Sequence, residues 1–174
     1  MTIALLVLGL VLGLVATLPG WLLRDTEVAH TIGAGVGLLV VATLGITMLF
    51  YPSYAAAGDG RRGMLTVLVA AFAILGGGPV TAALLHRVDT GGPVEQAGNV
   101  LRGGAWIGVM ERAAIFATVV GGWPDGLAVV LALKGLGRYP ELKTPGAAER
   151  FIIGTFISVL WALALAGILA ALLH

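Results

Sequence analysis

The sequence predicts an all-α protein, a polytopic transmembrane helix bundle with about six membrane segments. Hydrophobic residues make up 59% of the chain and charged residues only 11%, whereas roughly 25% of residues are charged in a soluble domain. The mean hydropathy is +1.02. The apolar residues are gathered in runs, most of which approach the roughly 20 residues that a helix needs to cross a bilayer. We therefore expect a single transmembrane domain over residues 1–174.

The N-terminal part, residues 1–85, contains three apolar runs, at residues 3–23, 28–51 and 64–85. The first two runs are joined by a short polar segment, which predicts a helical hairpin. Each carries two glycines four residues apart, a spacing that lets membrane helices approach closely. The third run contains Gly-Gly-Gly-Pro at residues 76–79. Glycines weaken a helix and proline removes a backbone donor, so we expect a kink or break there.

The C-terminal half, residues 103–174, follows a polar connection at residues 86–102 and contains three further runs, at residues 103–120, 126–136 and 150–173. The middle one of these is the fifth run of the chain and has only about eleven residues, roughly half of a spanning length. It is therefore either a short tilted span that carries Lys134 inward or a re-entrant segment.

Charged residues within these apolar runs are the candidate functional residues. Glu111 and Arg112 lie near the middle of the fourth run, where one charge costs about 2.5–3.5 kcal/mol at the bilayer centre. Adjacent helical residues point about 100° apart, so each needs its own partner. We expect Lys134 to pair with Glu111, and Glu149 or Glu141 to pair with Arg112. The predicted transport or polar-network residues are Glu111, Arg112, Lys134, Arg138, Glu149 and Arg150.

Two interpretations of this charged network remain open. It is a relay for protons or ions, or an anion site built on arginines, since ionisable residues within membranes commonly mark functional sites. Alternatively, it is a structural ion-pair network that fixes the register of the bundle. Lys134, Arg138 and Lys143 also form a basic patch that is suited to lipid head groups, although cytoplasmic loops of most membrane proteins are similarly basic. His30 and His86 are interpreted as incidental interfacial residues.

Several classes of protein are excluded by the residues present. The chain has no cysteine, which rules out disulfides and thiolate metal sites. It contains no Gly-x-Ser-x-Gly elbow, no His-Glu-x-x-His pair and no phosphate-binding Gly-x-x-x-x-Gly-Lys loop. The net charge is +1 and no basic run is present, which argues against nucleic acid as a partner. We predict no enzyme activity, no catalytic residues, no metal and no cofactor.

Three charged blocks resemble a family of small bacterial, actinobacterial-type multi-span membrane proteins of unknown function. The blocks are Gly-x-x-Ile-Gly-x-x-Glu-Arg at 104–112, Lys-x-x-x-Arg at 134–138 and Ala-Glu-x-x-x-Ile-Gly-Thr at 148–155. The sequence departs from the family at Arg150-Phe151, where an aromatic pair is expected, and the first hundred residues lie outside the resemblance. The resemblance implies a polytopic bacterial membrane protein and supplies no activity.

The sequence therefore predicts a small transporter or channel component that moves protons or small ions through the Glu/Arg/Lys site, with Glu111 as the switching carboxylate. The alternative is a non-transporting scaffold that binds lipid head groups or a partner protein through residues 134–143. A third hypothesis is a lipid-modifying enzyme with Glu111 in a lipid-facing groove. We expect a multi-pass protein of the bacterial inner membrane. Its partners would be membrane lipids, a small ion or anionic ligand, and further copies of the chain, because glycine motifs occur on several helices.

Overall fold

A computed structural model of the chain describes residues 2–22, 27–50, 59–88, 104–143 and 146–173. Over these residues every regular element is a helix, so the all-α prediction is confirmed for the described part of the chain. The elements are α1 (Thr2–Leu22), α2 (Glu27–Phe50), α3 (Asp59–Val88), α5 (Gly104–Val120), α6 (Gly126–Gly137), the 3₁₀ turn η2 (Glu141–Lys143) and α7 (Ala147–Leu173).

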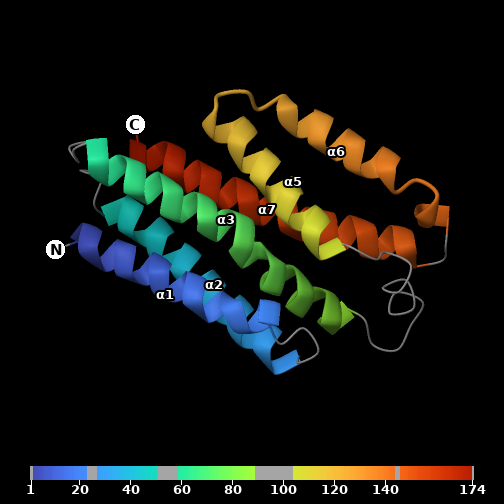
Figure 1. The fold of residues 1–174 in the computed structure, drawn as a ribbon, viewed down its shortest axis with the longest axis horizontal. Helices are drawn as coiled ribbons and strands as arrows, with labels where there is room; N and C mark the ends of the chain where they lie inside the picture. The colour runs from blue at the N-terminus through green and yellow to red at the C-terminus, as the bar shows by residue number, and fades with distance from the viewer. Residues whose placement is uncertain (1, 23–26, 51–58, 89–103, 144–145, 174) are drawn as a thin grey trace.

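Helices α3 and α7 run antiparallel through the middle of the bundle (Figure 1). The α1–α2 hairpin packs on one side of them, and the α5–α6 hairpin packs on the other. The beginnings of α1 and α3 and the ends of α2 and α7 lie at the same end of the bundle (Figure 1). Because α3 contacts α1, α2, α5 and α7, it is the element on which both hairpins are assembled.

The helix boundaries follow the apolar runs, except in α3 and α7. Helix α3 begins at Asp59 rather than at residue 64 and ends at Val88 rather than at residue 85. It continues through residues 76–79, so of the predicted kink or break the break is absent. Helix α7 begins at Ala147 rather than at residue 150, which places Glu149 in its first turn, where a carboxylate interacts favourably with the helix dipole. Of the predicted polar connection at 86–102, only residues 86–88 are described, at the end of α3, and residues 89–102 lie outside the described part.

The α5–α6 turn is a Schellman motif. Gly122 has a φ of 73°, a left-handed conformation that favours glycine. The Trp123 amide donates to the Thr118 carbonyl at 2.8 Å, and the Gly122 amide donates to the Val119 carbonyl at 3.1 Å. A Cβ atom at Gly126 would lie 2.6 Å from the Thr118 side chain. Because Gly122 and Gly126 have no side chains, α6 is able to pack closely against α5 after the turn.

Helix α6 has 12 residues and is about 18 Å long at 1.5 Å per residue. Its apolar side chains Leu127, Val130 and Leu131 pack against Ile115 of α5 and against α7. The fifth apolar run therefore forms one short helix. Alone, such a helix is shorter than the roughly 30 Å hydrocarbon core of a bilayer.

Two stretches of the described chain, residues 62–88 and 147–171, are long and apolar enough to cross a membrane. Shorter apolar stretches lie at residues 6–19, 28–44 and 126–137. The main core is formed by α1, α2, α3 and α7 around Leu10, Phe72 and Trp161. Large apolar side chains also cover the outside of the bundle, including Leu39, Val67 and Leu160. The described part of the molecule is therefore apolar both inside and outside.

Candidate functional site

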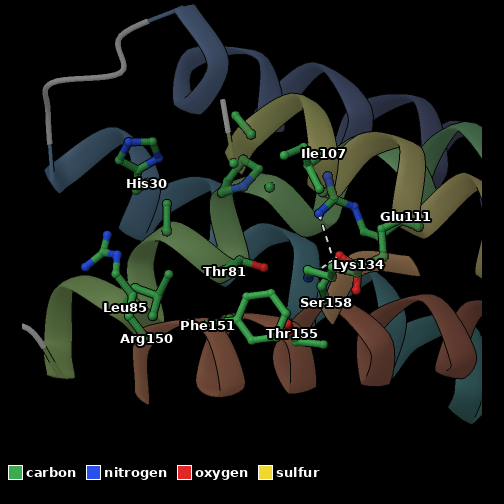
Figure 2. Close-up of a pocket in the computed structure, with 18 of the residues that line it drawn as sticks. His30, Thr81, Leu85, Ile107, Glu111, Lys134, Arg150, Phe151, Thr155 and Ser158 are labelled. Carbon is green, nitrogen blue, oxygen red and sulfur yellow. Dashed lines mark hydrogen bonds and ion pairs between the residues drawn. The ribbon is translucent and has the colours of Figure 1, made fainter. Parts of the chain in front are cut away.

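A cavity of about 610 Å³ lies among the helices and contains most of the predicted site residues. In Figure 2, Lys134 and Ser158 lie toward one end of it, Leu85 and Arg150 lie toward the other, and Phe151 lies between them. Its charged and hydroxyl-bearing lining consists of Thr81, Glu111, Arg112, Lys134, Arg138, Arg150, Thr155 and Ser158. Among the described residues, the cavity lining thus carries four cationic side chains and one carboxylate, apart from histidines.

The ion pair between Lys134 and Glu111 is present, as predicted from the sequence. Lys134 Nζ donates to Glu111 Oε2, which links α6 to α5. The Lys134 ammonium also lies 5.3 Å from the centre of the Phe151 ring on α7, within the range of a cation–π interaction. Glu111 is only 4% exposed, and its second oxygen, Oε1, has no hydrogen-bond partner among the described residues. The pair therefore leaves one acceptor of the carboxylate unused.

Arg112 is 2% exposed and is bonded to neutral groups rather than to a carboxylate. Its Nε donates to the Ile74 carbonyl of α3 at 2.7 Å, and its Nη1 donates to Ser158 Oγ of α7 at 3.3 Å. The predicted pairing of Arg112 with Glu149 or Glu141 is therefore wrong. The remaining nitrogen, Nη2, has no hydrogen-bond partner in the described part of the chain. A buried cation with an unused donor thus lines the cavity.

The glycines of α3 create the space for this arrangement. A Cβ atom at Gly77 would lie 2.6 Å from Cδ of Arg112 and 2.7 Å from Cδ1 of Trp161. A Cβ atom at Gly78 would lie 2.6 Å from the Trp21 ring. These distances are shorter than packed side chains tolerate, so large groups from three helices approach α3 only where it has no side chain.

Three consecutive carbonyls of α3 accept side-chain hydrogen bonds in the turn before the glycines. Trp161 Nε1 donates to the Ala73 carbonyl at 3.1 Å, Arg112 Nε donates to that of Ile74, and Trp21 Nε1 donates to that of Leu75 at 3.0 Å. Pro79 has no N–H, so the Leu75 carbonyl four residues earlier lacks its usual helical donor. The Trp21 indole supplies that donor, which explains how the helix continues through a proline.

The other predicted residues are divided between the cavity and the outer surface. Arg150 and Arg138 line the cavity, and Arg138 also contacts Glu141 at 3.5 Å. Glu149 is exposed in the first turn of α7 and is not part of the lining, so its predicted place in the network is wrong. Lys143 is exposed, stacks 5.1 Å from the Tyr139 ring centre and also lies outside the lining.

Sequence reasoning missed several lining residues. Ser158, Thr155 and Phe151 lie on α7 among apolar neighbours and carry no motif. His30 and His86, interpreted as incidental, both line the cavity and stack with ring centroids 5.9 Å apart. A useful signal was available for α7: residues 151, 154, 155 and 158 recur at intervals of three and four, which places them on one helical face together with Arg150.

Comparisons with known proteins give no assignment. No protein-family model, curated protein or solved structure matches the chain. The family resemblance of the three charged blocks therefore stays a prediction.

Proposed function

We propose that this chain is a multi-pass membrane protein and a small transport or channel component, which moves a small charged solute or ion through the cavity. The observation that carries the proposal is the cavity itself, because it borders an ion pair near the middle of α5 whose hydrogen-bonding capacity is not fully used. A purely structural network would be expected to satisfy its buried charges.

The membrane location is supported by the two long apolar stretches and by the outer surface. Residues 62–88 and 147–171 are long enough to cross a bilayer. Outward-facing side chains on other helices are also apolar, for example Leu39 on α2 and Leu133 on α6. A surface of this kind is stable against lipid and costly against water. We propose the inner membrane of a bacterium as its location.

Glu111 is the proposed switching residue. Its Oε2 is bonded to Lys134, and its Oε1 has no described partner, so the carboxylate is able to exchange lysine for a proton or for a passing solute. The exchange would loosen α6 from α5, since Glu111 and Lys134 link these helices. A change of bonding at this position is therefore coupled to the packing of α6.

A second candidate function is a scaffold that binds lipid head groups at the end of α6. Lys143 and Tyr139 are exposed and stacked on each other beside Arg138, an arrangement of basic and aromatic groups that suits a membrane interface. It involves the predicted head-group residues Lys134, Arg138 and Lys143, of which only the first two line the cavity. Substitution of Lys143 therefore separates the two functions.

The test is a flux measurement in proteoliposomes that contain a pH-sensitive dye, under gradients of protons, monovalent cations, chloride and small carboxylates. We expect flux with the wild-type protein and a loss of at least tenfold with Glu111→Gln, because the amide keeps the shape but cannot change charge. The variant is first shown to fold by its thermal unfolding and its elution volume.

Lys143→Gln is the matched control, since it removes a cation outside the cavity. Transport predicts that its flux equals that of the wild type. The scaffold function predicts no flux from any variant and weaker binding of Lys143→Gln to vesicles containing anionic lipid. Absence of flux under every gradient, with folded protein, contradicts the transport proposal.

A further inference from the structure

We propose that the cavity binds an organic anion, a molecule with one carboxylate or phosphate group and an apolar body. The role of this anion as the transported solute rests on the proposed function. Its binding is tested separately. The inference narrows the solute from any small ion to one chemical class.

The charge of the lining favours an anion. Arg112, Lys134, Arg138 and Arg150 line the cavity, and Glu111 is the one carboxylate among the described lining residues. Glu111 is already paired with Lys134, so among the described lining residues the one carboxylate is taken up by one of four cationic side chains. A cation entering this lining meets more repulsion than attraction, particularly where burial reduces screening.

Arg112 supplies the specific donor for the anionic group. The side chain is 2% exposed, its Nε and Nη1 are held by Ile74 and Ser158, and its Nη2 has no partner among the described residues. A guanidinium fixed through two nitrogens presents the third in a defined direction, and charged donors form the strongest hydrogen bonds with carboxylate or phosphate oxygens. The Thr155 hydroxyl, also in the lining and without a described partner, offers a second polar contact.

The size and the apolar walls of the cavity fit an organic molecule better than an inorganic ion. The cavity measures about 610 Å³, within the range of roughly 300–1,000 Å³ that is typical of sites for organic molecules. Leu85, Ile107 and Phe151 form part of its wall. Figure 2 places Phe151 between the Lys134–Ser158 end and the Leu85–Arg150 end. An anionic group at the first end thus places an attached apolar body against Phe151 and Leu85.

The binding test uses purified protein in an uncharged detergent and follows the fluorescence of the tryptophans, since Trp21 lines the cavity. The probes are hexanoate, hexyl phosphate, inorganic phosphate and hexylammonium. We expect saturable binding of the two six-carbon anions, binding at least tenfold weaker for inorganic phosphate, and none for hexylammonium. Equal saturable binding of hexylammonium and hexanoate, or no saturable binding of any anion, overturns the inference.

Two variants locate the binding site. Arg112→Lys should weaken hexanoate binding at least tenfold. Because this substitution also touches the packing of α3, Gly154→Leu is the second variant. A Cβ atom at Gly154 meets only ordinary contacts, at 3.6 Å from Leu85, and the longer side chain fills space without removing a charge. Gly167→Leu on the same helix is the control, because nothing lies within 4 Å of its Cβ position. Equal weakening by both leucine variants contradicts binding in the cavity.

A second arm distinguishes lipid from soluble anions. The protein is placed in phosphatidylcholine nanodiscs with and without phosphatidic acid, and hexanoate is titrated into both. Competition by phosphatidic acid assigns the anionic group to a lipid, and its absence assigns it to a soluble molecule; both outcomes support an organic anion. Binding without flux retains this inference and contradicts transport, whereas flux of protons or cations without anion binding contradicts this inference alone.

Discussion

At the scale of single residues, Arg112 is the most constrained charge in the described structure. Its guanidinium is held by a backbone carbonyl of α3 and by the Ser158 hydroxyl of α7, while the carboxylate beside it in sequence bonds Lys134. The arginine therefore joins three helices without neutralising its charge through a direct ion pair. A cation that is held by neutral groups keeps its attraction for an incoming anion.

Substitution of Gly77 tests this packing. Gly77→Ala places a methyl group 2.6 Å from Cδ of Arg112 and 2.7 Å from Trp161, so one of these side chains must move. We expect a loss of about 1–3 kcal/mol in the free energy of unfolding, the usual cost of overpacking. Equilibrium unfolding in mixed detergent micelles measures it.

The control for this substitution is Gly167→Ala, which is exposed on α7 and meets nothing within 4 Å. It should be neutral or slightly stabilising, because alanine favours a helix. Equal stability of the two variants would show that α3 has room at position 77.

The site residues that could be recognised from the sequence are the charged residues within apolar runs. Glu111 and Lys134 were predicted as a pair because an uncompensated charge is costly in either run, and each offers the opposite sign. The partners of Arg112 were not predictable by this reasoning, because a backbone carbonyl such as that of Ile74 leaves no signal in the side chains. Glu149 was misplaced because α7 begins earlier than its apolar run and leaves this residue at the surface.

At the scale of elements, one turn of α3 accepts the side-chain hydrogen bonds that link it to its neighbours. The carbonyls of Ala73, Ile74 and Leu75 accept hydrogen bonds from three different helices, and the following glycines admit the donors. The expected break at residues 76–79 followed from local helix propensity, which does not include donors from elsewhere in the fold. Tertiary hydrogen bonds and packing against Trp21, Arg112 and Trp161 thus compensate for a weak helical sequence.

A double-mutant cycle between Trp21 and Pro79 tests the compensation. Trp21→Phe removes the donor to the Leu75 carbonyl and should destabilise the protein by about 0.5–1.5 kcal/mol. In a Pro79→Ala background the new N–H of residue 79 is able to bond that carbonyl, so the same substitution should cost clearly less. The unfolding free energies of the four proteins give the coupling; additive effects would mean that the indole stabilises α3 only by packing.

At the scale of the whole molecule, the described part of the bundle has an apolar core and a largely apolar exterior, and five charged side chains line one cavity. The apolar character of the bundle was predicted from composition. The cavity was not predictable, because it depends on how α3, α5 and α7 meet. The glycine spacing predicted homo-oligomers, yet Gly33 and Gly37 contact Pro79 and Trp161 inside the chain. Gly9 and Gly104 meet nothing within 4 Å, so of the predicted glycine pairs these members stay open to a second copy, which we still expect.

Placement in a bilayer is tested with single cysteines, since the natural chain contains none. Leu160 is 62% exposed near the middle of α7, and Asp125 is exposed in the α5–α6 turn. We expect Leu160→Cys to resist a membrane-impermeant maleimide from both sides of intact vesicles, because lipid covers it, and Asp125→Cys to react from one side. Fast labelling of Leu160→Cys in intact vesicles would contradict a lipid-facing α7.

The row of three occupied carbonyls has a consequence for recognising relatives of this protein. Adding or deleting one residue in α3 near position 76 would rotate the rest of the helix by about 100° and separate the glycines from the side chains they admit. We therefore expect four parts to occur together in any relative that keeps this packing: a tryptophan ending the first helix, Gly-Gly-Gly-Pro in α3, Glu-Arg within α5, and Ser-x-x-Trp in the last helix. We expect chains that carry this set to share the scaffold of the cavity even where the rest of the sequence differs.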